Sequence, residues 1–384
     1  MAKNAIVIGG GIGGLAAASS LARAGVAVTL VEQASEISEV GAGIQVSPNG
    51  LAVLRALGLE NALERSGAVQ AEAVVLSDYR QGRRVAQLDL RRLKDQRYLF
   101  VHRADIVSLL LRTAKQANVS IELGRRAVCI RPGAITEVTF EDGGQARAEL
   151  VVCSDGLHSV GRSVVNGESQ AMFTGQVAWR ALVPAHNPPR QATVTMGPGR
   201  HIVSYPLRGG TLTNIVAVQE RDVWAPEGWH HQDDPTNLRA AFSDFGGPVR
   251  DLLEQVERVH LWGLFRHPVA ETWVKGGAVL LGDAAHPTLP FLAQGANLAL
   301  EDAWTLARVV TAGQSLEDYQ KMRKNRAAKV VAAASGNAWK YHLQPGPVRW
   351  AAHRALSVGS SLAPTAMMRQ FNWIYGHDVT KPLG

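Results

Sequence analysis

Glycines and carboxylates that follow short apolar runs are the residues of this sequence best suited to ligand chemistry. A β-branched run leads into residues 9–14, which have the form GxGxxG. In such a turn Gly9 makes the tight bend, Gly11 lets the backbone approach a pyrophosphate, and Gly14 lets a helix pack against a sheet. Glu32 ends the next apolar run, where a carboxylate can accept hydrogen bonds from a ribose. This pattern predicts a dinucleotide site, and the acid favours FAD or NAD over NADP.

Two further carboxylates follow apolar runs of the kind that form buried parallel strands. Residues 150–153 precede Asp155, and residues 278–281 precede Asp283. The carboxyl ends of parallel strands face the ligand crevice, so both side chains could bind the hydroxyls of a ribityl chain. Each aspartate could instead cap a turn or a helix. The glycine motif alone does not separate FAD from NAD, whereas three strand-end motifs in this order favour FAD.

The elements that must position the first motif are two strands and an alanine-rich helix between them. Residues 5–8 predict the first strand, and residues 15–25 predict a helix that stops at Gly25. Residues 26–31 predict the second strand. Strand, glycine turn, helix and strand together form the βαβ unit that the glycine motif requires.

The segment between the two aspartate motifs predicts a substrate-binding sheet. Residues 179–184 and 200–207 alternate in polarity as antiparallel strands do, and Gly209-Gly210 predicts a hairpin turn. Period-two geometry places His201 and Tyr205 on one face of their strand. A histidine can remove a phenolic proton near neutral pH, and a tyrosine can hydrogen-bond the same oxygen. Either side chain could instead only pack in a core.

Three other polar residues carry a structural interpretation beside a functional one. His286 could line a pocket, but a hydrogen bond to its own turn is the stronger interpretation. Gln45 could point toward a bound ring or pack in its loop. Arg180 could pair with a substrate carboxylate or tie two strands together.

Composition excludes several classes of protein. The chain has 384 residues, of which 46% are hydrophobic and 19% charged, so we expect two packed lobes that fold throughout. The net charge of +7 is scattered, and no nucleic-acid-reading module accompanies it. The two cysteines, Cys129 and Cys153, predict neither a disulfide framework nor a metal site. We expect no signal peptide, no membrane span and a cytoplasmic location.

The last hundred residues have helical periodicity. Residues 316–341 predict a long amphipathic helix, Pro345 and Pro347 break it, and residues 348–371 predict a second helix. The basic stretch 321–329 predicts a solvated helix face rather than a membrane-surface helix. The apolar faces of these helices suggest packing on the first lobe and a dimer interface.

With these motifs the sequence resembles the group A flavoprotein monooxygenases, the FAD-dependent aromatic hydroxylases related to 3-hydroxybenzoate and salicylate hydroxylases. The resemblance covers nearly the whole chain. It rests on five segments: the opening glycine motif, Gly41-Ala42-Gly43-Ile44, His102-Arg103-Ala104-Asp105, Asp155-Gly156 and residues 282–302.

The resemblance implies a set of FAD contacts from separate parts of the chain. The glycine motif and Glu32 would bind the ADP end of FAD, and Arg103 would bind toward the pyrophosphate. Asp283 would bind the ribityl chain, and the backbone at residues 295–297 would bind the isoalloxazine ring. Asp155 belongs to a motif credited with both FAD and NAD(P)H contacts. The full implied set is Gly9, Gly11, Gly13, Gly14, Glu32, Gln33, Gly43, Arg103, Val128, Asp155, Asp283, Gly295, Ala296 and Asn297.

The resemblance also implies where the substrate lies. His201 corresponds to the base of 3-hydroxybenzoate 6-hydroxylase, with Tyr205 beside it, and Gln45 and Pro290 would contact the substrate. That enzyme carries a glutamine where this chain has Pro290, so we expect a different substrate. Ser154 and Gly161 depart from the usual alanine and aliphatic residue, which affects local NAD(P)H contacts only.

The prediction is therefore an α/β protein with a Rossmann-like FAD-binding domain, a smaller mixed-sheet substrate domain and C-terminal helices. The expected ranges are 1–70, 97–165 and 265–345 for the FAD domain, 71–96 and 166–264 for the substrate domain, and 346–384 for the tail.

The expected reaction is hydroxylation of a small aromatic or heteroaromatic substrate with O2 and NADH or NADPH, through a flavin C4a-hydroperoxide. A flavoprotein epoxidase, an N-hydroxylase and a non-hydroxylating FAD-binding oxidoreductase remain alternatives. The substrate, the choice of NADH or NADPH, and the state as monomer or homodimer stay open.

Overall fold

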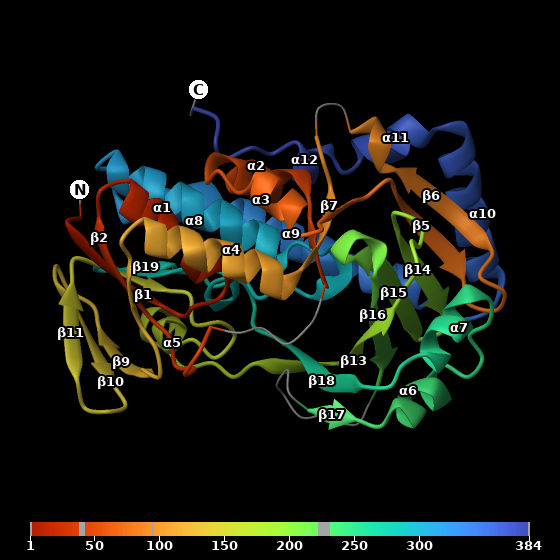
Figure 1. The fold of residues 1–384 in the computed structure, drawn as a ribbon, viewed down its shortest axis with the longest axis horizontal. Coiled ribbons are helices and arrows are strands. Elements are labelled where there is room, and N and C mark those ends of the chain that lie inside the picture. Colours follow the sequence, from red (N-terminus) through yellow and green to blue (C-terminus); the bar gives the residue numbers. More distant parts are fainter. Residues whose placement is uncertain (1, 38–42, 94–95, 222–230, 383–384) are drawn as a thin grey trace.

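Two sheets, one in each lobe, organise the computed structural model, which describes residues 2–37, 43–93, 96–221 and 231–382 (Figure 1). A mainly parallel sheet lies in the lobe that contains the N-terminus, and a larger, mainly antiparallel sheet lies in the other lobe. Two three-stranded sheets complete the strands. The predicted α/β architecture is confirmed.

The first sheet has six strands in the order β19-β20-β12-β1-β2-β8. β1, β2, β8, β12 and β20 run parallel to their neighbours, and only β19 is antiparallel. Apolar side chains cover both faces of the central strands, as parallel sheets require. The strands are β1 (Asn4–Ile8), β2 (Ala27–Val31), β8 (Ser120–Glu122), β12 (Leu150–Cys153), β19 (Val274–Lys275) and β20 (Ala278–Leu280).

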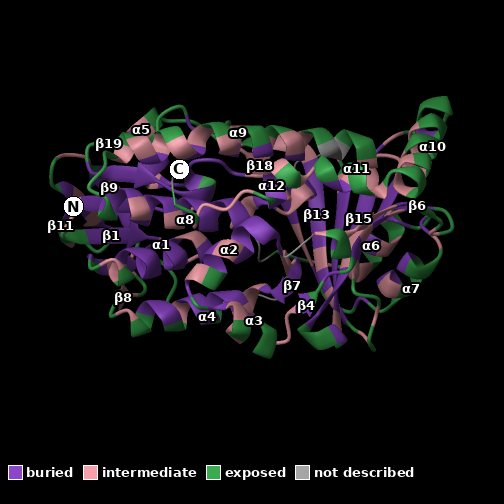
Figure 2. Cartoon of the chain, turned by 90° about the horizontal axis from the view of Figure 1, so that it is seen from above, coloured by how far each residue is buried: buried purple, intermediate pink, exposed green. Residues whose placement is uncertain are grey.

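Helices cover this sheet, and α1 packs between α4 and α8. Ala16, Ala17 and Ala18 of α1 are completely buried, and their small size allows this close helix packing. Most of α1 is coloured as buried in Figure 2. The helices of this lobe are α1 (Ile12–Arg23), α2 (Pro48–Ala56), α3 (Glu60–Arg65), α4 (Arg103–Gln116), α5 (Val160–Asn166) and α8 (Gly295–Thr311). One small sheet consists of β3 (Gly43–Val46), β7 (Leu99–His102) and β4 (Val69–Gln70). The other consists of β9 (Ala127–Arg131), β10 (Thr136–Phe140) and β11 (Gln145–Ala148).

The second sheet has eight strands in the order β17-β18-β13-β16-β15-β14-β5-β6, and only β14 and β5 pair in parallel. Its outer face packs on two short helices, α6 (Pro235–Ala241) and α7 (Pro248–Glu254). The strands are β5 (Ala73–Asp78), β6 (Arg84–Asp89), β13 (Met172–Pro184), β14 (Gln191–Gly197), β15 (Arg200–Leu207), β16 (Leu212–Glu220), β17 (Gln232–Asp233) and β18 (Val259–Arg266).

The alternation predicted for β15 is confirmed. Ile202 belongs to the outer core with Trp179 and Phe242, whereas Tyr205 packs on the opposite side against Phe100 of the first lobe. Gly209 and Gly210 have positive φ values of 67° and 90°, as the predicted hairpin turn requires. Three 3₁₀ turns flank the strands: η1 (Leu90–Arg92), η2 (Arg208–Gly210) and η3 (Gly282–Ala284); a fourth, η4 (Pro290–Leu292), precedes α8.

Helix α9 (Leu316–Tyr341) matches its predicted bounds and reaches from the first sheet to the second (Figure 2). The prediction of one helix over residues 348–371 is wrong. The chain forms α10 (Pro347–Leu362), α11 (Pro364–Arg369) and α12 (Asn372–Tyr375). Ala363, with φ −134° and ψ 52°, breaks the helix because the residue before a proline avoids the helical conformation. The predicted domain ranges stay a prediction.

Candidate active site

The glycine turn between β1 and α1 is shaped by close backbone approaches. Gly9 has φ +103°, and a Cβ there would lie 2.5 Å from the carbonyl oxygen of Ser154. A Cβ on Gly14 would lie 2.0 Å from the carbonyl oxygen of Gly9. A Cβ on Gly11, in contrast, would meet nothing within 4 Å. Packing therefore requires Gly9 and Gly14, whereas Gly11 borders open space that a pyrophosphate can occupy.

This difference gives a first prediction about two glycines of one motif. Gly11→Ala should fold normally, since its φ of −74° suits alanine, but should weaken FAD binding by about 10-fold or more, because the methyl group enters the pyrophosphate space. Gly14→Ala should lower stability by about 1–3 kcal/mol, because the turn and α1 must separate. Flavin titration and thermal denaturation measure the two effects. Equal stability of both variants would contradict the assignment.

Glu32, after β2, holds the glycine turn in place. Its carboxylate accepts hydrogen bonds from the backbone N–H groups of Gly10, at 2.6 Å, and Ala34, at 2.8 Å. The predicted contacts of the ribose with Glu32, and of the cofactor with Gly13 and Gln33, stay predictions. So does Val128, which is exposed on β9.

Asp155 and Asp283 follow neighbouring parallel strands, β12 and β20. One oxygen of Asp155 accepts a hydrogen bond from the Val160 N–H at 2.8 Å, and its buried Oδ1 has no hydrogen-bond partner among the described residues. Burial raises the pKa of Asp155. The unsatisfied oxygen fits a ligand hydroxyl, because a buried acceptor without a partner is costly.

Asp283 lies in the turn η3, which follows β20. The residue is exposed, yet surrounding protein atoms raise its pKa by desolvation, and the charges of His286 and Arg103 lower it. Arg103 starts α4, far away in sequence, so the fold brings a guanidinium and a carboxylate predicted to contact FAD close together. Residues that fit a charged, hydroxyl-rich cofactor therefore converge here.

The start of α8, a helix that contacts the turn η3, supplies backbone donors. The first N–H groups of a helix have no partners within it, so Gly295, Ala296 and Asn297 can donate to a ligand. The side chain of Asn297 has a structural role: it donates to the carbonyls of Gln45 and Ala293 and accepts from the Ser47 N–H, at 2.8–3.1 Å. It thereby joins β3 to α8. Of the predicted Gly41–Ile44 segment, residues 41 and 42 lie outside the described residues.

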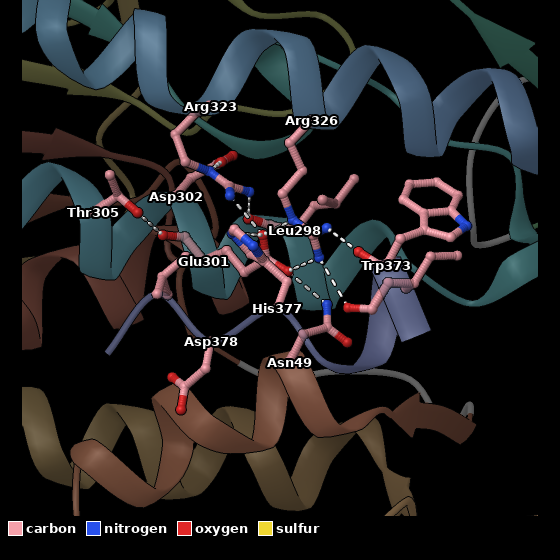
Figure 3. Close-up of polar contacts among 12 residues, drawn as sticks. Asn49, Leu298, Glu301, Asp302, Thr305, Arg323, Arg326, Trp373, His377 and Asp378 are labelled. Atoms are coloured by element: carbon pink, nitrogen blue, oxygen red, sulfur yellow. Dashed lines mark hydrogen bonds and ion pairs between the residues drawn. The ribbon is translucent and has the colours of Figure 1, made fainter. Parts of the chain in front are cut away.

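A buried charge cluster fixes α8 against α9 (Figure 3). Nη1 of Arg323 lies 2.5 Å from Oε2 of Glu301, and Nε of Arg323 lies 2.7 Å from Oδ1 of Asp302. Nε of Arg326 lies 2.7 Å from Oε2 of Glu301. Arg323, Glu301 and Asp302 are at most 1% exposed. The prediction that this basic stretch is a solvated face is therefore wrong for its two arginines, because α8 presents two carboxylates to that side of α9.

His286 is part of the same cluster. Its Nε2 lies 2.5 Å from an oxygen of Asp302, and its ring is completely buried. Both predicted interpretations, a bond to its own turn and a pocket wall, are therefore wrong for the ring. Burial tends to raise the pKa of Asp302, but the charges of His286 and Arg323 outweigh this and hold it at about 2. The cluster thus connects the Asp283 turn to α8.

His201 and Tyr205 lie on the inner face of the large sheet. The Tyr205 ring packs 5.0 Å from that of Phe100 and would touch a Cβ on Gly43 at 2.6 Å. His201 is 1% exposed, with Phe291 and Tyr341 packed against its ring. Its Nδ1 lies 2.7 Å from Nε2 of His342. Sequence reasoning missed His342, which lies 141 residues away with no local motif.

The remaining candidates surround this face. The side-chain oxygen of Gln45 accepts a hydrogen bond from the Tyr98 hydroxyl at 2.8 Å, which fits the loop-packing interpretation. Arg180 stacks over Trp262 at 4.5 Å, and its charge lowers the pKa of Tyr205 against the larger effect of burial. Pro290 begins the turn that carries Phe291 to His201. Within the described residues, no three His, Cys, Asp or Glu side chains are grouped to hold a metal, and no helix could cross a membrane.

A parallel sheet with a glycine turn and two carboxylates after neighbouring strands is typical of a dinucleotide-binding protein. Residues 3–334 match the family model described as FAD binding domain. With this match and with aromatic hydroxylases among relatives that are 31–35% identical, the chain belongs to the group A FAD-dependent aromatic hydroxylases.

Relatives align over almost the whole chain. A 3-amino-4-hydroxybenzoate 2-monooxygenase of Streptomyces platensis is 35% identical, covering 98% of this chain and 96% of the relative. A 3-hydroxybenzoate 6-hydroxylase of Aquipseudomonas alcaligenes is 31% identical, covering 99% of each. The crystal structure of Klebsiella pneumoniae HpxO with FAD and uric acid superposes with a TM-score of 0.84 at 26% identity, over 96% of this chain and 97% of the other.

Proposed function

We propose that this chain uses FAD, NAD(P)H and O2 to hydroxylate a small phenolic ring held against the inner face of the large sheet, between His201 and Tyr205. The observation that carries the proposal is the position of these two side chains on β15, facing the lobe that contains the glycine turn, Asp155 and Asp283. Bound FAD supplies the activation of O2 with electrons from NAD(P)H.

The residues that would hold FAD come from five segments. Gly11 leaves room for the pyrophosphate, Glu32 would accept from the ribose, and Asp283 would accept from the ribityl hydroxyls. Arg103 would balance the phosphate charge, and the start of α8 would donate to the flavin ring. These positions fit the group, since they combine open space at Gly11 with helix N–H donors, and Asp155 adds a buried carboxylate oxygen that has no hydrogen-bond partner among the described residues.

His201 would take the phenolic proton. Burial, together with the neighbouring His342, lowers the pKa of His201 well below its usual value, so the ring is neutral at physiological pH and one ring nitrogen keeps a lone pair that can accept a proton. Loss of the phenolic proton makes the ring electron-rich, which electrophilic oxygen transfer requires. Apolar residues cover the same face and exclude water; they include Ala178, Val218, Leu289 and Phe291.

A carboxylate on the substrate fits this face as well. Both curated relatives act on hydroxybenzoates by name. Arg180 lies near Tyr205, and a guanidinium there would attract a benzoate carboxylate. A panel of phenolic acids, pyridine acids and uric acid tests this: hydroxylated product should approach one per NAD(P)H consumed for a phenolic acid. Oxidation of NAD(P)H without product from any compound would instead support a non-hydroxylating flavoprotein.

Replacing His201 by alanine should slow hydroxylation by about 10²- to 10⁴-fold without loss of FAD. As the pH falls, the wild-type hydroxylation rate should stay constant until the pH reaches the lowered pKa of His201. The rate of the variant should fall at a higher pH, because the variant depends on phenol that is already ionised in solution. Product formation measured against pH checks this. The exposed His186 provides the control, and His186→Ala should leave the profile unchanged. An identical profile for His201→Ala would remove this residue from the mechanism.

A further inference from the structure

A line of three side chains leads from His201 to the surface. Nδ1 of His201 lies 2.7 Å from Nε2 of His342, and Nδ1 of His342 lies 2.7 Å from a carboxylate oxygen of Glu220. The two histidines are 1% and 5% exposed, whereas the Glu220 side chain is 51% exposed. The line therefore starts in the core and ends in solvent.

The carboxylate sets the direction of both hydrogen bonds. A carboxylate can only accept hydrogen bonds, so Nδ1 of His342 must donate to Glu220. Nε2 of the neutral His342 ring then accepts, and Nδ1 of His201 must donate to it. Nε2 of His201 is then the unprotonated ring nitrogen, and it can accept the proton of a phenol.

Three separate segments hold this line rigidly. His342 directly follows α9 as its C-cap residue, and its carbonyl accepts from the Gly199 N–H at 3.1 Å. The Gly199 carbonyl accepts from the Glu220 N–H at 2.9 Å, so the β14–β15 turn fixes both ends of the outer step. Glu220 is the last residue of β16, the strand that pairs with β15.

The surroundings of His201 leave His342 as the route for a proton. Tyr341 and His342 are the titratable groups in ring contact with it among the described residues, and the other ring contact is Phe291. Its strand neighbours are Met196 and Val218. Burial raises the pKa of Tyr341 to about 12, so Tyr341 keeps its own proton. A cation left on His201 would lie in an apolar site where no carboxylate of the described residues contacts its ring.

We propose that His342 and Glu220 form a proton relay that carries the phenolic proton from His201 to solvent. The substrate O–H bond breaks and a proton binds Nε2 of His201, while the Nδ1 proton of His201 passes to Nε2 of His342. The Nδ1 proton of His342 then passes to Glu220 and on to water or buffer. Each ring gains one proton and loses one, no electrons move, and the reverse transfer restores both tautomers. This inference rests on the proposed function.

The test follows phenol ionisation in the FAD-loaded enzyme without NAD(P)H, so no oxidation takes part. The probe is 4-hydroxy-3-nitrobenzoate, whose ionised and neutral forms differ in absorbance, mixed with enzyme in weak buffer at a pH below its phenol pKa. His342→Gln is the sharpest variant, because a glutamine amide can accept from His201 and donate to Glu220 but cannot pass a proton. Ionisation of the bound probe should slow by about 10²-fold, with its affinity and the FAD content unchanged.

Two further variants separate relay from structure. In His342→Ala the slow ionisation should be restored by added imidazole, which a purely structural role would not produce. Glu220→Gln should slow ionisation and make its rate depend on buffer concentration, and the exposed His186→Gln should match wild type. An unchanged ionisation rate in His342→Gln would overturn the relay. If wild-type enzyme binds the probe but never ionises it, the role of His201 in the proposed function fails instead.

Discussion

Replacing Arg323 by methionine should lower the free energy of unfolding by about 3–5 kcal/mol. The guanidinium lies between Glu301 and Asp302, and both carboxylates are completely buried. Methionine retains much of the packing volume but removes one cationic partner from each buried carboxylate. Glu301 then keeps its contact with Arg326, and Asp302 keeps its contact with His286. Urea denaturation at pH 7, with FAD content measured alongside, checks the expectation.

Lys321, two residues earlier on the same helix, provides the matched control. Its side chain is 72% exposed, and Lys321→Met should change stability by no more than about 0.5 kcal/mol. The pH of the measurement matters because the folded-state pKa of Asp302, about 2, lies below the ordinary value of 3.8. Its contribution is complete above the ordinary value and is lost as the pH falls toward 2. Equal losses in the two variants would contradict the importance of the buried cluster.

Replacing Asp283 by alanine should yield protein that is folded but largely free of FAD. A hydrogen bond to a charged group contributes about 1.5–3 kcal/mol, so the loss of one ribityl contact should weaken binding by about 10- to 150-fold. Without flavin, the Asp283→Ala variant should be no less stable than wild type. Desolvation disfavours the ionised carboxylate of Asp283, as its raised pKa shows. Flavin absorbance of the purified protein and titration with FAD measure the effect.

The outcome also separates two roles for this aspartate. If Asp283 only shapes the turn after β20, the alanine variant should keep its flavin and lose stability instead. Asp251→Ala, at an exposed position on α7, serves as the control and should resemble wild type in both measurements. Yellow, fully loaded Asp283→Ala protein would remove the carboxylate from the cofactor site.

Local patterns in the sequence were sufficient for much of the fold. The bounds of β12, β15 and α9 follow from short apolar runs and regular periodicity. The glycine motif and the placement of His201 and Tyr205 on one face also depend only on neighbouring residues. The break at Pro364 was readable too, since proline acts on the residue directly before it, but helical periodicity on both sides concealed it.

The sequence by itself determined the family, the parallel βαβ unit and the face of the sheet that carries the candidate base. Only the tertiary structure decided which polar groups meet. His201 and His342 lie 141 residues apart, and Arg323 and Asp302 lie 21 apart on different helices. Nothing local distinguishes an arginine that faces solvent from one that faces two carboxylates. Burial and pairing depend on how distant elements pack, and this packing converts an ordinary basic stretch into a core cluster and an isolated histidine into the start of a line of hydrogen bonds.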